Sequence, residues 1–108
     1  CSDGDVTAFL DDVAAAGADG FIFEPVVDFD RVVADFGGTH VIVGSKVDAR
    51  TLTFGTPGEV RREVDATLDA AGDLPGFMFA VGNHIPSNIP AENVEFYIEY
   101  LKENWQRP

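Results

Sequence analysis

The chain has 108 residues, and 19 acidic side chains against 7 lysines and arginines give it a formal net charge of −12 at pH 7. Such a surface repels the phosphates of nucleic acids and of anionic lipids, so we expect neither as a partner. No apolar run approaches the roughly 20 residues that span a bilayer, and the single cysteine, Cys1, excludes an internal disulfide. These features predict one cytoplasmic unit, residues 1–108, with a solvated acidic surface; adaptation to high salt is an alternative reason for the acidity.

Apolar residues recur at helical spacing in four segments and form short continuous runs in three others. In chain order, helices are predicted over 5–17, 28–36, 56–72 and 90–105, and strands over 20–24, 39–44 and 76–81. Asp5, Asp28 and Thr56 stand at N-cap positions, and Glu59 completes a capping box with Thr56. A single further helical turn is expected around 48–52.

The strand and helix patterns also predict which faces are buried. The strand segments are apolar almost throughout, which is typical of strands covered on both faces. In the last helix, the residues expected to face inward are Val94, Tyr97, Ile98, Leu101 and Trp105, and those expected to face outward are Glu92, Glu95, Glu99 and Glu103.

Alternation of helices and strands predicts an α/β fold with parallel strands and right-handed crossovers. Three parallel strands leave two sheet edges unpaired, and a closed (β/α)8 barrel needs roughly 250 residues. We therefore predict a partial (β/α)8 TIM barrel: its last three βα units and a preceding helix. Such a unit, if it exists alone, is expected to pair its edges with another copy and form a homo-oligomer.

The segment 81–94 holds the most informative candidates for a functional site. Asn83 and His84 follow the third strand, and the carboxyl ends of strands carry the chemistry of barrels and open α/β sheets. His84 can donate a proton or a hydrogen bond or bind a metal, and a purely structural role is the alternative. His40 precedes its strand and is expected to be structural, on the opposite face.

Further candidates lie at the ends of the other predicted segments. Glu24 ends an apolar strand, where a desolvated carboxyl suits acid–base work or ligand binding. Lys46 is one of two lysines and can bind an anionic group. The structural alternatives are a helix cap for Glu24, or an ion pair of Lys46 with Glu24 or Asp48. Asp3 precedes the first helix and joins the candidates.

The N-terminal residues leave two questions open. Cys1, Asp3 and His84 have the residue types of a zinc site, but they come from two distant segments without tight spacing. We therefore predict no metal and no cofactor. Because the sequence starts with Cys1 rather than Met, we expect a piece of a longer protein, and a mature lipoprotein is the alternative.

Four segments together resemble the C-terminal part of the uroporphyrinogen decarboxylase superfamily, which includes the decarboxylase and zinc-dependent corrinoid methyltransferases. They are 2–6, 44–50, 54–61 and 82–94. In the last one, decarboxylases tend to have Gly-His-Gly-Ile, with the His bonded to the porphyrinogen, and methyltransferases Gly-Cys-Gly-Ile, with Cys on zinc. This chain has Gly82-Asn83-His84-Ile85 there.

The resemblance implies a parent protein that removes the acetate carboxyl groups of a tetrapyrrole. It implies a tetrapyrrole or corrinoid-type ligand at the carboxyl rim of the strands. From their placement at the ends of the predicted segments, we expect Asn83 and His84 to have catalytic roles and Glu24, Lys46 and Asp3 to contact the substrate. In this family the key acidic residue and the arginines that bind substrate come from the N-terminal half, so the chain is not expected to be catalytic alone. The alternatives are a zinc- or corrinoid-dependent methyltransferase-like fragment and a non-enzymatic, self-associating half-barrel module.

Overall fold

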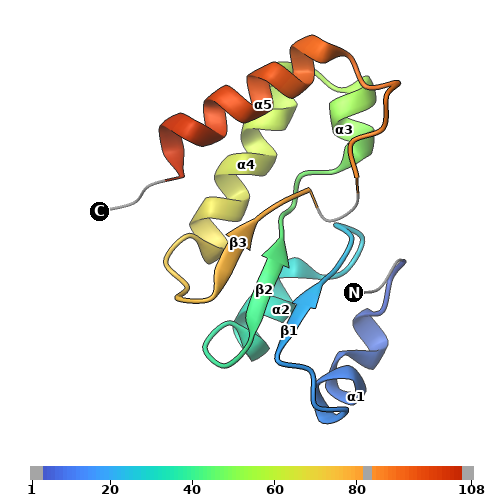
Figure 1. Cartoon of the computed structure of the whole chain (residues 1–108), viewed down its shortest axis with the longest axis vertical. Helices are drawn as coiled ribbons and strands as arrows, with labels where there is room; N and C mark the ends of the chain where they lie inside the picture. Colours follow the sequence, from blue (N-terminus) through green and yellow to red (C-terminus); the bar gives the residue numbers. More distant parts are fainter. Residues whose placement is uncertain (1–3, 82–83, 106–108) are drawn as a thin grey trace.

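The computed structural model describes residues 4–81 and 84–105 (Figure 1). Its elements, in chain order, are a 3-10 turn η1 (Thr7–Phe9), α1 (Leu10–Ala15), β1 (Gly20–Ile22), α2 (Phe29–Phe36), β2 (Val41–Gly44), α3 (Ala49–Phe54), α4 (Pro57–Ala71), β3 (Phe77–Phe79) and α5 (Ala91–Asn104). Within these ranges, no helix is long and apolar enough to cross a bilayer.

The strands form one parallel sheet in the order β1-β2-β3. Both pairings are parallel, which confirms the predicted α/β fold, and the sheet and its helices are those of a partial barrel. In register, Ile22 lies beside Val43, and Val43 lies beside Met78. Parallel pairing brings the carboxyl ends of the strands to one edge of the layer.

Two of the three predicted N-caps open helices as expected. The Asp28 side chain accepts the Arg31 backbone N–H at 3.1 Å at the start of α2. The capping box of Thr56 and Glu59 is complete at the start of α4. These starts depend on side chains within three residues of the cap, which is why the local sequence predicts them.

The first helix is shorter than predicted. The Asp5 side chain accepts hydrogen bonds from the Thr7 N–H at 3.0 Å and from its hydroxyl, ahead of the 3-10 turn. Regular α-helix begins only at Leu10, because Phe9 has a non-helical backbone with φ −115° and ψ 9°. The prediction over 5–17 is therefore wrong for its first turn.

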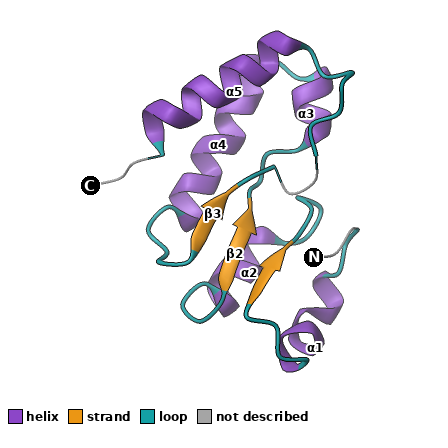
Figure 2. Ribbon diagram, in the orientation of Figure 1, coloured by secondary structure: helices purple, strands orange, loops and turns teal. Residues whose placement is uncertain are grey.

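Helices cover one face of the sheet (Figure 2). On that face Phe21 and Ile42, 3% exposed each, pack with Val32 and Phe36 of α2 and with Leu10. A second core joins α3, α4 and α5, and Phe79 and Val81 pack against it.

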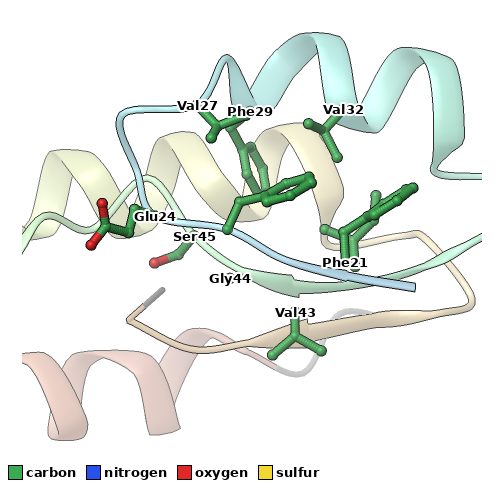
Figure 3. A pocket seen from close by; sticks show the side chains of 10 residues that line it. Phe21, Glu24, Val27, Phe29, Val32, Val43, Gly44 and Ser45 are labelled. Atoms are coloured by element: carbon green, nitrogen blue, oxygen red, sulfur yellow. The ribbon is translucent and has the colours of Figure 1, made fainter. Parts of the chain in front are cut away.

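The opposite face of the sheet has no cover within the described part of the chain, so the predicted burial on both faces is wrong. Ile22 is 40% exposed, Val41 44% and Met78 61%. Figure 3 shows the Val43 side chain pointing away from the side on which Phe21 and Val32 lie. We call the face that carries Ile22, Val41, Val43 and Met78 the open face.

Two of the residues expected to face inward on α5 are exposed instead. Ile98 is 41% and Trp105 56% exposed, whereas Tyr97 is 6% exposed. Ile98 and Trp105 line a groove beside β3 rather than the core between α3, α4 and α5. The four glutamates of α5 are exposed, as predicted.

Candidate functional site

A polar hollow of about 270 Å³ lies where the strands end. Its described lining is Glu24, Pro25, Val26, Asp48, Ala49, Arg50 and Val81. Glu24, Pro25 and Val26 follow β1, and Val81 follows β3. Asp48 lies between β2 and α3, and Ala49 and Arg50 are the first residues of α3. The hollow is therefore built from the carboxyl side of each strand, the position expected for a site in a parallel α/β sheet.

Glu24 forms the part of the hollow that follows β1. Its Oε2 accepts the backbone N–H of Gly4 at 2.8 Å, which ties the segment before η1 to the end of this strand. Figure 3 shows the Glu24 carboxylate turned away from the Phe29 ring and out of the apolar side of the sheet. The position makes Glu24 a half-buried acceptor at the rim.

Asp48 and Arg50 form the charged wall of the hollow. The Asp48 carboxylate accepts the Arg50 backbone N–H at 2.8 Å and its Nη2 at 2.7 Å, with Nε 3.2 Å from each oxygen. Hydrogen bonding to Arg50 lowers the pKa of Asp48, and partial burial opposes this only in part. The Arg50 side chain is 75% exposed, so its guanidinium also faces solvent.

Glu63 of α4 fixes this wall from behind. Its Oε2 accepts the Asp48 backbone N–H at 3.1 Å, and its Oε1 accepts the Thr51 hydroxyl at 2.6 Å. The start of α3 is thus anchored to α4 by a carboxylate that lies fifteen positions further along the chain. Such anchoring gives the Asp48–Arg50 pair a defined position.

The structure does not bring Lys46 to the hollow. Its Nζ lies 2.8 Å from Oδ1 of Asp30 on α2, so neither predicted partner, Glu24 or Asp48, is the one it pairs with. The Lys46 backbone N–H donates to the Thr67 hydroxyl of α4 at 2.9 Å, on the helix-covered side. The ion pair with Asp30 and this backbone contact hold Lys46 against α2 and α4.

His84 does not belong to the described lining of the hollow. It is exposed in the loop after β3, three positions beyond Val81, which lines the hollow. The other predicted residues of this kind, Asn83, Asp3 and Cys1, lie outside the described residues. Among the described residues, no group of three His, Cys, Asp or Glu side chains is arranged to hold a metal ion.

Arg50 lines the hollow but is not among the site residues predicted from the sequence. A usable signal existed, because Asp48 precedes a predicted helical turn and a cation two positions after a capping Asp can reach back to it. His40, in contrast, is where it was expected. It precedes β2 and its ring stacks on Phe21 with centroids 5.0 Å apart, a packing role.

The apolar pocket between the sheet and α2 is not a second site (Figure 3). Phe21, Phe29, Val32 and Ile42 line it, and its volume is about 10 Å³. This is about the space of one water molecule. The pocket is a packing gap beside the rim, and the polar hollow remains the candidate site.

Comparison with known proteins gives one family. The family model described as uroporphyrinogen decarboxylase (URO-D) matches residues 2–104. No solved structure matches the chain.

Curated relatives carry the same name. The uroporphyrinogen decarboxylase of Paraburkholderia phytofirmans is 33% identical over 86 residues, which are 80% of this chain and 23% of the relative. That of Chloroflexus aurantiacus is 28% identical over 98 residues, 91% of this chain and 27% of the relative. That of Pseudoalteromonas atlantica is 29% identical over 91 residues, 84% of this chain and 25% of the relative. The chain thus spans about a quarter of the length of these relatives.

Proposed function

The chain belongs to the uroporphyrinogen decarboxylase family, and on that premise we propose that it supplies one part of the substrate rim of a tetrapyrrole decarboxylase. The observation that supports this proposal is the polar hollow at the carboxyl ends of the strands. In the proposed reaction an acetate side chain loses its carboxyl group as CO2. The C–C bond to that group breaks, and the remaining carbon gains a proton to become a methyl group.

The groups of the hollow suit two kinds of ligand atom. The guanidinium of Arg50 can bind a carboxylate in a fork geometry, and its exposure leaves donors for a ligand. The Glu24 carboxylate can accept the N–H of a pyrrole ring. His84, in the loop after β3, is the proposed proton donor, because a histidine side chain can donate a proton or a hydrogen bond to a bound ligand.

The charge of the hollow indicates that the chain does not turn over substrate by itself. Arg50 is the only cation in the described lining, and it is already paired with Asp48. A tetrapyrrole with several carboxylates needs more positive charge than this, and the chain as a whole carries −12. We therefore propose that the remaining binding and catalytic groups come from the part of the barrel that the chain does not match.

A chimera tests this function. In it, the present chain replaces the matching segment of the Chloroflexus aurantiacus relative, and CO2 release from a carboxylated tetrapyrrole is measured. We expect turnover by the chimera and none by the chain alone. His84→Ala should lower kcat about 100-fold, the contribution typical of a general acid.

Matched variants make the result specific. Glu24→Gln should raise KM, whereas Glu103→Gln, an exposed position on α5, should change neither constant. A folded chimera that releases no CO2 would contradict the proposed function. Unchanged turnover in His84→Ala would show that this residue has only a structural role.

A further inference from the structure

A short segment ahead of the first helix is bonded to the connection between β1 and α2 at two places. At one end, the Gly4 backbone N–H donates to Oε2 of Glu24 at 2.8 Å. At the other end, the Thr7 hydroxyl accepts the backbone N–H of Asp28 at 3.0 Å. We call residues 4–7 the strap, because they bridge the end of β1 and the start of α2.

Thr7 fastens the strap to α2. Its backbone carbonyl accepts Nη1 of Arg31 at 3.0 Å, in addition to the contact of its hydroxyl with Asp28. The Asp5 side chain accepts both the N–H and the hydroxyl of Thr7, which fixes the turn between Gly4 and Thr7. Every polar group of Thr7 therefore has a partner in the strap or at the start of α2.

The anchors of the strap are themselves held in place. Nε of Arg31 lies 3.4 Å from Asp35 on α2, and its Nη2 lies 3.7 Å from Asp11 on α1. Val6 of the strap packs against the core between the sheet and α2. The position of the strap is therefore set by one charged contact and one apolar contact, both of which involve regular elements of the fold.

Gly4 has a backbone conformation that glycine adopts far more readily than other residues. Its φ is +80°, in the left-handed region, and a Cβ at this position would meet no atom within 4 Å. The conformation, and not a lack of space, therefore favours glycine here. With this backbone, the Gly4 N–H points at the Glu24 carboxylate.

The strap acts on the polar hollow through Glu24. Glu24 and Arg50 both line the hollow, whereas Gly4 and Thr7 do not belong to its described lining. A carboxylate and a guanidinium in one hollow attract each other. A hydrogen bond that fixes the carboxylate therefore bears on how much of the guanidinium is available to a ligand.

We propose that Thr7 is a positioning residue for substrate binding: by fastening the strap, it lets the Gly4 N–H hold the Glu24 carboxylate in place at the hollow. This inference rests on the proposed function, in which Glu24 accepts a pyrrole N–H and Arg50 binds a substrate carboxylate. Thr7 acts through Gly4 and Glu24 and does not touch the substrate. Without the strap, the Glu24 carboxylate would turn toward Arg50 and compete with the substrate for it.

The chimera that tests the proposed function also tests this inference. Thr7→Val keeps the shape of the side chain but removes the hydroxyl that contacts Asp28 and Asp5. It should raise KM for the tetrapyrrole about fivefold, the effect of one lost hydrogen bond, and leave kcat within about twofold. Thr7→Ser keeps the hydroxyl and should restore KM. A folded Thr7→Val chimera with unchanged KM would overturn the proposal.

A double-mutant cycle with Glu24 separates positioning from general damage to the fold. Glu24→Ala removes the carboxylate that the strap holds, so the addition of Thr7→Val should change KM no further. Residues that act independently give additive effects instead. Additive effects of Thr7→Val and Glu24→Ala on KM would therefore contradict a role of Thr7 through Glu24.

Gly17 provides a matched control for Gly4. Its φ is +94°, and a Cβ there would also meet no atom within 4 Å, so alanine introduces the same kind of backbone strain at both positions. The Gly17 N–H, however, donates to the carbonyl of Ala14 at 3.1 Å and not to Glu24. Gly4→Ala should raise KM about fivefold, whereas Gly17→Ala should leave KM unchanged. Equal effects on KM would argue against the strap.

Amide exchange in the isolated chain tests the strap without turnover. Measured by NMR, the Gly4 N–H should exchange with water about fivefold faster in Thr7→Val than in the original chain. Thr7→Ser should keep the original rate. An unchanged rate in Thr7→Val would overturn the inference whatever the activity. A folded chimera that releases no CO2, together with the expected change in Gly4 exchange, would contradict the proposed function and support the hold of the strap on Glu24.

Discussion

Arg50 holds Asp48 by two routes: its Nη2 donates to the carboxylate at 2.7 Å, and its backbone N–H donates to the same group at 2.8 Å. The first interaction is an ion pair at the rim of the hollow, and the second caps α3. One carboxylate therefore serves both the charge of the candidate site and the start of the helix beside it. Two substitutions at Asp48 can separate these contributions.

We expect Asp48→Ala to lower the free energy of unfolding by about 1 kcal/mol, the usual contribution of an N-cap. Asp48→Asn should cost less, because Asn caps helices as well as Asp and only the charge is lost. The pKa of Asp48 is lowered in the folded chain, so its charge stabilises above the unfolded-state value of about 3.8. The contribution of this charge to the free energy of unfolding should disappear as the pH falls below 3.8 and passes through the folded-state pKa of Asp48.

Urea unfolding of both Asp48 variants, from neutral to acid pH, measures how the cap and the charge contribute to the free energy of unfolding. The difference in free energy of unfolding between the original chain and the Asp48→Asn variant should become smaller only below pH 3.8. A difference that stays constant down to the acid limit would contradict a role for the charge. Arg62→Ala, an exposed change on α4, serves as the control.

The capping box of α4 gives a second prediction. The Thr56 hydroxyl accepts the Glu59 N–H at 3.3 Å, and the Glu59 carboxylate accepts the Thr56 N–H at 3.2 Å. Thr56→Ala should lower the free energy of unfolding by about 1 kcal/mol. Ser87→Ala, in the exposed loop before α5, should change it little in the same urea titration. Equal effects of the two substitutions would argue against the cap.

The helix starts could be predicted from sequence because their causes are local. Asp28 and Thr56 bind backbone groups three positions away, and both are where the sequence indicates. The parallel sheet followed from the alternation of elements. The prediction of the 5–17 helix is wrong for its first turn, because the Asp5 side chain accepts hydrogen bonds from Thr7 in a tighter local turn.

Exposure and long-range partners could not be predicted in the same way. Met78 and Trp105 are apolar in a pattern typical of burial, yet the described chain provides nothing to cover them. Lys46 pairs with Asp30, sixteen positions away, and no local spacing announces that contact. Periodicity reports which face is apolar, but only the packed structure shows what lies against it.

Asn93 is a buried amide for which a third prediction follows. It is 6% exposed, and its Nδ2 donates to the carbonyl oxygens of Leu52 at 2.8 Å and Gly55 at 3.3 Å. These carbonyls lie at the end of α3, so the amide joins α5 to α3. Asn93→Ala should lower the free energy of unfolding by about 1–3 kcal/mol, because the two carbonyl oxygens lose their hydrogen-bond donor in a buried position.

Hydrogen exchange distinguishes this role from simple packing. In Asn93→Ala the amides of α3 should exchange faster than those of α2, which Asn93 does not contact. Asn88→Ala, exposed in the preceding loop, is the matched control and should leave both helices unchanged. Uniform acceleration over both helices would point to global destabilisation instead.

The two tyrosines of α5 give the last prediction. Burial raises the pKa of Tyr97 to about 12. In the unfolded chain the Tyr97 phenol titrates near 10, so the folded state is the one that keeps its proton. The stability linked to Tyr97 should be fully present below pH 10 and be lost as the pH rises toward about 12.

Absorbance of the phenolate and urea unfolding between pH 9 and 12 test this together. Because the chain has only two tyrosines, the Tyr97→Phe variant should lose one phenolate step, the one assigned to a pKa of about 12, and its stability should fall less steeply with pH. Tyr100→Phe is the control: its hydroxyl donates to Asp65 at 2.6 Å, which raises the pKa of Tyr100 as well, but the residue is less buried. That variant should keep the Tyr97 step. If Tyr97→Phe left the alkaline loss of stability unchanged, the buried phenol would not be its cause.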